Sequence, residues 1–389
     1  WKTNFSFFSQ EIGILRSSHV GNTNDLVYAI ELARPTIIEP FNHKVNPPKQ
    51  LNKHHTASIQ YSRRYSSNGK LNAKYSWQRN NRKEYDVRRG SYKNKAAIDL
   101  TLDSHNLTAN YEWGGTKWSF DSGAFLQIQD NYSNPNTGIR RLIPDYIKTK
   151  AGIYFTSSYT PSNDFSLDFG FHFAHQNNQV KKFYKNSRWN KENYEERLGA
   201  YVIREVLSQK LVEQRLIFNN LSLSTGVKYL INPDLKLRLN FFHTERAPDI
   251  AEIFSDGLHH SLASIEYGNP FLKSEITQKF VINFEKERGN FRYNFSPYLT
   301  YGQNYIIIEP KGFELTIRGA FPVWEYRPVS AIIRGFDLDL SLRLGERIEL
   351  KNNSSWIEGY EKVTKTPLIN IPSFTTTNQI PVSYTHLRA

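Results

Sequence analysis

Apolar side chains alternate with polar ones in paired segments along most of the chain, and a short turn separates the two members of each pair. Alternation at every second residue is the pattern of a β-strand with one apolar and one polar face, so each pair predicts a β-hairpin. A strand pair is also expected within residues 1–16 and a further strand at 25–33. Six hairpins are predicted, with turns at residues 66–69, 103–106, 161–164, 232–234, 286–290 and 345–347.

Long polar segments, interpreted as loops, separate the hairpins at residues 78–95, 129–150, 176–197, 244–274, 302–328 and 358–373. Short turns at one end and long loops at the other are typical of outer-membrane β-barrels. The second face of the strands is polar, as Lys236, Arg238 and Asn240 illustrate. This favours a membrane barrel, although a soluble sheet with one solvated face gives the same alternation. The link at residues 113–118 breaks the order, since it is a second short connection.

The composition fits a large β architecture. Aromatic residues make up 14% of the chain and charged residues 22%, and no apolar run reaches the roughly 18 residues of a transmembrane helix. The mean hydropathy of −0.59 decides nothing, because a barrel alternates apolar and polar faces. The absence of cysteine excludes disulfides, thiolate chemistry and cysteine-ligated metal sites. A net charge of +13 attracts polyanions, but no nucleic-acid motif accompanies it.

Residues 243–273, called the signature segment below, form a long excursion between two predicted strands. Pro248 suits the first turn of a helix, Asp249 and Glu252 favour its N-terminus, and Gly257 is placed to end it. A structured excursion of this length predicts a functional loop. One face of the expected helix is apolar and consists of Ile250, Ile253 and Phe254.

The signature segment resembles the barrel signature of TonB-dependent outer-membrane receptors. The resemblance lies in Arg246-Ala247-Pro248, in residues 252–260 (Glu-Ile-Phe-Ser-Asp-Gly-Leu-His-His) and in residues 266–270 and 272–275. Three other stretches resemble the same family: residues 13–22, 78–86 and 325–338. Together these stretches span most of the chain.

The resemblance implies an all-β fold, a transmembrane antiparallel β-barrel that is part of a 22-stranded receptor barrel. We expect it to occupy residues 1–380, truncated at both ends and with its plug domain absent, because the chain begins at Trp1 and reads as an interior fragment. Residues 381–389 lose the strand alternation and are expected to be a non-native tail.

The implied function is TonB-energised uptake, at the bacterial outer membrane, of a ferric siderophore, haem or a related metal chelate. The implied partners are the TonB complex, reached through a missing N-terminal segment, the missing plug domain, outer-membrane lipid and lipopolysaccharide, and the chelate itself. No nucleic acid and no bound cofactor are expected. The sequence contains no nucleophile elbow, phosphate loop or zinc-protease helix, so we expect no enzyme.

The candidate ligand-binding residues are Arg246, His259, His260, Glu266, Arg79 and Arg82. Adjacent imidazoles can ligate a metal or haem iron, but neighbouring residues of an extended segment point to opposite sides. Hydrogen bonding of the histidines to backbone or carboxylates is therefore the alternative, and no metal ligand is assigned. Together with Arg88 and Arg89, the two arginines either steer an anionic chelate toward the pore or belong to a solvated loop that touches lipopolysaccharide or pairs with Glu84 and Asp86.

Two other functions stay open from the sequence. A passive outer-membrane porin or adhesin would show the same hairpin pattern. A secreted, soluble β-rich protein that binds glycans through its aromatic residues would show it too. The identity of the ligand is not encoded in any motif of this chain.

Overall fold

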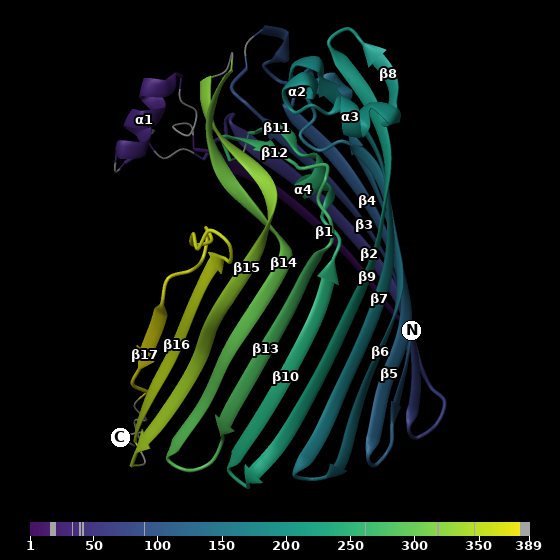
Figure 1. Ribbon diagram of the computed structural model, residues 1–389, viewed down its shortest axis with the longest axis vertical. Helices are drawn as coiled ribbons and strands as arrows, with labels where there is room; N and C mark the ends of the chain where they lie inside the picture. The colour runs from purple at the N-terminus through teal and green to yellow at the C-terminus, as the bar shows by residue number, and fades with distance from the viewer. Residues whose placement is uncertain are drawn as a thin grey trace.

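The computed structural model describes residues 1–15, 21–32, 34–38, 40, 43–88, 90–260, 262–316, 319–345 and 347–381. One large, mainly antiparallel sheet dominates it, with short helices at one end (Figure 1). The elements are β1 (Lys2–Gly13), α1 (Thr23–Glu31), β2 (Lys49–Arg64), β3 (Gly69–Tyr85), β4 (Ile98–Gly114), β5 (Trp118–Ser133), β6 (Asp145–Ser162), β7 (Phe165–Lys185), α2 (Asn186–Lys191), α3 (Glu195–Leu198), β8 (Val202–Val206), β9 (Gln209–Asn232), β10 (Leu235–Arg246), α4 (Ile250–Phe254), β11 (Asp256–His259), β12 (Ser264–Tyr267), β13 (Glu275–Lys286), β14 (Phe291–Thr316), β15 (Gly319–Leu344), β16 (Ile348–Glu361) and β17 (Thr375–Gln379).

Fourteen of the 17 strands, all except β8, β11 and β12, follow one another as antiparallel neighbours and form a curved wall. The order along the wall is the order of the sequence, from β1–β2 at one edge to β16–β17 at the other. Within the described residues, β1 and β17 each pair with one wall strand only. The predicted all-β antiparallel fold is confirmed.

Short turns join the strands at one end of the wall and long connections at the other, as predicted (Figure 1). Five of the six predicted hairpins are confirmed: β2–β3, β6–β7, β9–β10, β13–β14 and β15–β16. The helices α2 and α3, the strand β8 and the hairpin β11–β12 all lie at the long-connection end.

The predicted turn at residues 103–106 is wrong, because β4 runs through it without interruption. The true short turn is the link at residues 115–117, between β4 and β5. The error has a physical cause. Ile98 is buried on the inner side, whereas Leu107 faces outward on the opposite face of the same strand. The apolar side chains therefore lie on one face in the first part of β4 and on the other face in its second part. In the sequence, this shift in the alternation resembles two strands joined by a turn.

Two predictions near the N-terminus are also wrong. The expected strand pair is the single strand β1, and residues 25–31 belong to the helix α1 instead of a strand. The side chain of Asn22 caps this helix by accepting a hydrogen bond from the backbone N–H of Asp25 at 2.9 Å. Part of the family-like stretch 13–22, residue Arg89 and the expected tail from 382 onward lie outside the described residues.

Several predicted loops are extensions of strands. Residues 78–85 continue β3, and most of residues 302–328 belongs to β14 and β15, which have 26 residues each. A barrel strand needs only about 9–11 residues to cross a bilayer. The extra length therefore projects beyond it, where polar side chains can face water on both sides while the backbone ladder continues.

The outer face of the wall carries a belt of exposed apolar side chains, which include Ile59, Tyr75, Leu107, Leu126, Ile153, Phe173, Leu239, Phe280 and Leu299. A continuous exposed belt of this kind is the surface that a barrel presents to lipid. Within the described residues, no helix is long and apolar enough to cross a membrane.

Buried apolar residues gather at the long-connection end, in four separate clusters. The largest buried rings, Trp189 of α2 and Tyr184 of β7, pack edge to face in one cluster with Leu198 of α3. The core of this molecule is therefore the packing of connecting segments against the wall, and it lies where the signature segment folds.

Candidate functional site

The signature segment folds against the inner face of the wall. Residues 247–274, called the inner loop below, contain α4 and the hairpin β11–β12. Asp249 caps α4 by accepting a hydrogen bond from the N–H of Ala251, and the Glu252 carboxylate accepts one from the N–H of Asp249 at 2.6 Å. This capping box fixes where the helix begins. The prediction of a short helix with Ile250, Ile253 and Phe254 on one face is confirmed, although the helix ends at Phe254 and not at Gly257.

The apolar face of α4 is completely buried. Ile250, Ile253 and Phe254 are each 1% exposed. They pack with Val180 of β7 and with partly buried side chains of β6, β9, β14 and β15, namely Tyr146, Leu216, Phe218, Ile306 and Tyr326. The inner loop therefore joins strands that are far apart along the wall.

The hairpin β11–β12 attaches the other side of the inner loop to the wall. Ile265, Glu266 and Tyr267 of β12 pair in parallel with residues 323–325 of β15. Gly268 follows and donates its N–H to the carbonyl of Ser255 at 2.7 Å. It passes so close to α4 that a Cβ atom placed on it would lie 2.5 Å from the carbonyl carbon of Ile253. Only glycine fits here.

Arg246 ties the two ends of the inner loop together. Its guanidinium donates to both carboxylate oxygens of Glu252, at 2.9 and 3.1 Å, and to Glu275 at 3.1 Å. Glu275 in turn accepts a hydrogen bond from the N–H of Ile306. A bidentate arginine is geometrically specific, so Arg246 holds α4 against the start of β13.

The two adjacent histidines have different carboxylate partners. His259 donates from Nδ1 to Glu266 at 2.7 Å and accepts at Nε2 from Arg82 at 2.8 Å. These contacts assign the hydrogen to Nδ1. His260 is fully buried, and its Nδ1 lies 3.3 Å from Asp86. Four of the six candidate residues thus lie close together, namely Arg82, His259, His260 and Glu266, in a network that fastens the β11–β12 hairpin to the end of β3.

Arg79 lies elsewhere. It belongs to β3, like Arg82, but β3 pairs with β4 without a register shift, so positions 79 and 82 fall on opposite faces. Arg79 forms a bidentate pair with Asp103 at 2.8 Å on the outer face, next to Trp77. We therefore leave Arg79 out of the site.

A buried ionic cluster that the sequence reasoning missed lies at the start of β11. Asp256 is 1% exposed, and three cations surround it: Arg140 at 3.0 Å, Lys182 at 3.5 Å and Arg188 at 3.7 Å. Lys182 also donates to the carbonyl of Phe254 at 2.6 Å. The cations come from the β5–β6 connection, β7 and α2, so one carboxylate holds three segments of the chain to the inner loop.

The three cations determine the titration of Asp256. Burial by itself would raise the pKa of Asp256, but the charges of Lys182, Arg140 and Arg188 outweigh it and hold the pKa below its ordinary value. A lowered folded-state pKa contributes stability that is present above the ordinary value of about 3.9 and is lost as the pH falls through the folded-state value.

We therefore expect the inner loop to stay docked between about pH 7 and about pH 5 and to loosen only below about pH 4. Hydrogen-exchange protection of residues 250–268, corrected for the intrinsic exchange rate at each pH, measures this. A steady loss of protection between about pH 7 and about pH 5 would contradict the assignment of the carboxylate as the titrating group.

A signal for this cluster existed in the sequence, since Asp256 stands inside the family-like stretch 252–260. Its partners gave none, because Arg140, Lys182 and Arg188 lie in segments interpreted as solvated loops. Within the described residues, no group of three or more His, Asp or Glu side chains is placed to hold a metal ion.

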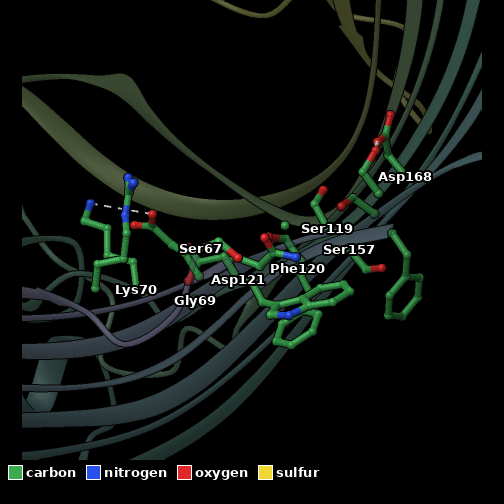
Figure 2. A pocket seen from close by; sticks show the side chains of 17 residues that line it. Ser67, Gly69, Lys70, Ser119, Phe120, Asp121, Ser157 and Asp168 are labelled. Atoms are coloured by element: carbon green, nitrogen blue, oxygen red, sulfur yellow. Dashed lines mark hydrogen bonds and ion pairs between the residues drawn. The ribbon is translucent and has the colours of Figure 1, made fainter. Parts of the chain in front are cut away.

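A cavity of about 580 Å³ lies on the inner face near the short turns. Figure 2 shows Ser119, Asp121 and Asp168 along the wall of this cavity. Its carboxylates accept hydrogen bonds from neighbouring strands, for example from Ser158 to Asp168 at 2.6 Å and from Asn110 to Asp121 at 2.7 Å. The polar side chains of the inner wall here form hydrogen bonds with one another. Such a surface suits an interior filled by water or by another part of the protein.

A curved antiparallel wall with an outer apolar belt, a polar inner face and a loop folded inside defines a transmembrane β-barrel of the receptor type. The model of the family "TonB dependent receptor-like, beta-barrel" matches residues 5–388. The chain therefore belongs to the TonB-dependent receptor β-barrel family, whose members are transporters and receptors. No curated protein sequence matches it.

Solved structures share this fold at low sequence identity. The ferric-catecholate import receptor Fiu of E. coli K12 aligns with a TM-score of 0.65 and 11% identity over 98% of this chain and 59% of its own. The copper transporter OprC gives 0.63 and 12% over 87% and 51%. The FrpB iron transporter of Neisseria meningitidis gives 0.59 and 13% over 99% and 55%. The chain spans a little over half the length of these structures.

Proposed function

We propose that the protein is an outer-membrane receptor that takes up a ferric siderophore, haem or a related metal chelate with energy supplied through TonB. Family membership supports the transport class, and the similar structures include an iron transporter and a copper transporter. The observation that carries the proposal is the inner loop. It is folded against the inner face and fixed there by the Arg246, His259 and Asp256 contacts, at the end of the wall where the long connections lie.

Two features favour this function over the alternatives. A passive porin needs an open interior, whereas the inner loop packs its helix across several wall strands. A secreted, soluble glycan-binding protein would not expose a continuous apolar belt on its outer face. The same belt supports contact with outer-membrane lipid, and lipopolysaccharide is the expected neighbour beyond it.

The proposal includes two protein partners. A plug domain would occupy the polar interior, for which the inner wall around Asp121 and Asp168 offers hydrogen-bonding groups. The inner-membrane TonB complex would act on that plug. The transported chelate is the small-molecule partner, and neither a bound cofactor nor a catalytic reaction is part of this function.

Uptake of radioactive iron by cells tests the proposal. The full-length receptor, expressed in a strain that lacks its own iron receptors, is expected to import iron from at least one chelate among ferric siderophores, ferric citrate and haem. The matched control is the same strain without TonB, in which uptake should fall to background. Equal uptake with and without TonB would instead identify a passive pore.

A further inference from the structure

A cavity of about 610 Å³ lies at the long-connection end, between α2, the end of β12 and the projecting parts of β14 and β15. Its volume falls within the range of small-molecule sites, about 300–1,000 Å³. Tyr267, which ends β12, forms part of its lining, so the inner loop supplies one wall of the cavity. None of the candidate residues predicted from the sequence lines it.

Positive charge predominates in the lining. Three carboxylates face five cations, and the cations come from separate parts of the chain: Arg140, Lys185, Arg188, Lys191 and Lys311. Some of these charged groups already have partners, since Lys311 pairs with Glu309 and Glu314 accepts a hydrogen bond from Tyr267 at 2.6 Å. In the part of the chain that the structure describes, Lys185 and Lys191 have no ion pair.

The charge beneath the cavity is also unbalanced. Arg140 and Arg188 share the single carboxylate of Asp256 with the buried Lys182. Cations that are removed from water are stable when each is matched by negative charge, and here one anion faces three cations, of which Lys182 and Arg188 are the more buried. An anion bound in the cavity above would reduce this excess, because electrostatic interactions are strong in a partly desolvated site.

Arg188 is held in place by its neighbours. The guanidinium of Arg188 lies over the ring of Tyr267, 3.7 Å from its centroid, and the Arg188 side chain is 13% exposed and lines the cavity. Phe313, which also lines the cavity, offers a half-exposed ring. A planar guanidinium beside aromatic faces suits carboxylate, phosphate or phenolate oxygens carried on a compact molecule.

We propose that this cavity binds a small, water-soluble polyanion through Arg188, Lys185 and Lys191. The inference rests on the proposed function in one respect: it assigns the transported chelate to the class that carries several negatively charged oxygen groups. It also assigns a binding site for the negatively charged groups, at the long-connection end of the receptor between α2 and β14–β15.

Calorimetric titration of the purified full-length receptor with citrate, and separately with inorganic pyrophosphate, tests the site. At least one of these probes is expected to bind, with an affinity that falls as sodium chloride is added. The double variant Lys185→Gln/Lys191→Gln should weaken binding by about tenfold. Both lysine side chains are exposed, so the variant should fold normally. The matched control is Lys74→Gln/Lys117→Gln, two exposed lysines toward the short-turn end, and it should leave the affinity unchanged.

Binding of neither probe, or equal affinity in the parent and the cavity variant, would overturn the inference. The result is independent of transport. If citrate or pyrophosphate binds but no chelate is imported, the proposed function fails and the anion site stands. If iron is imported while the cavity variant binds the probes like the parent, the anion site fails and the proposed function stands.

Discussion

Asp256→Asn should release the inner loop from the wall. The substitution keeps the shape of the side chain but leaves Arg140, Lys182 and Arg188 around a neutral group. Removing one partner of a buried ionic cluster costs about 3–5 kcal/mol, because the remaining charges are buried without compensation. Since about 1.4 kcal/mol corresponds to a factor of ten, exchange of the amides in residues 250–268 should accelerate on the order of 10²- to 10³-fold.

The matched control for this variant is Asp103→Asn. Asp103 also pairs with an arginine, but Arg79 is half-exposed on the outer face, where such a pair contributes about 1 kcal/mol or less. Heat-dependent gel mobility should stay normal in both variants, because the wall does not depend on the cluster. Unchanged exchange in Asp256→Asn would mean that the apolar face of α4 alone keeps the loop docked.

Gly268→Ala should separate β12 from α4. The added methyl group would lie 2.5–2.6 Å from the backbone atoms C and O of Ile253 and N of Phe254. Backbone atoms cannot rotate away as a side chain does, so the strain should reach about 3 kcal/mol, the upper part of the range for overpacking. The hydrogen bond from Gly268 to Ser255 should be lost with it, and exchange of the Gly268-position amide reports that loss.

Gly114→Ala provides the comparison. No atom lies within 4 Å of the position where its Cβ would be, and its φ is not in the left-handed region, so it should behave like the parent. If Gly268→Ala exchanges like Gly114→Ala, the inner loop adjusts more freely than the packing of α4 indicates.

The hairpin order and the helix at Ile250–Phe254 could be predicted because each depends on local pattern. The turn at Asn232–Asp234 and the capping box at Asp249 and Glu252 each depend on residues that are close together in the sequence. The length of the strands could not be predicted in this way. Beyond the bilayer, the inner face of the strands packs on the connecting segments. Val180 and Phe218 therefore point to the inner face, whereas the apolar residues of the membrane-crossing part of the same strands point to the lipid. This change interrupts the alternation from which strand length is predicted.

The candidate site was predictable only in part. Arg82 pairs with the buried Glu84, as one of the two readings of the arginines predicted, and it also donates to His259. The contact of His259 with Glu266, which fastens the loop, was not predicted from any local pattern. The cations around Asp256 come from three separate segments, and the cavity adds Lys311 from a fourth, β14. Only the register of the wall and the docking of the inner loop bring them together, and neither is encoded in local spacing.

The long strands β14 and β15 extend from the exposed apolar belt of the wall to the cavity at the long-connection end. Its backbone ladder is interrupted twice, between Gly302 and Tyr305 and between Pro310 and Phe313. Bulges of this kind are where a ladder bends most easily. The upper one lies next to Phe313 and Glu314, so the ladder can bend most easily beside this wall of the cavity. A bend there changes the position of Phe313 and Glu314 in the cavity and leaves the membrane-crossing part of both strands in place.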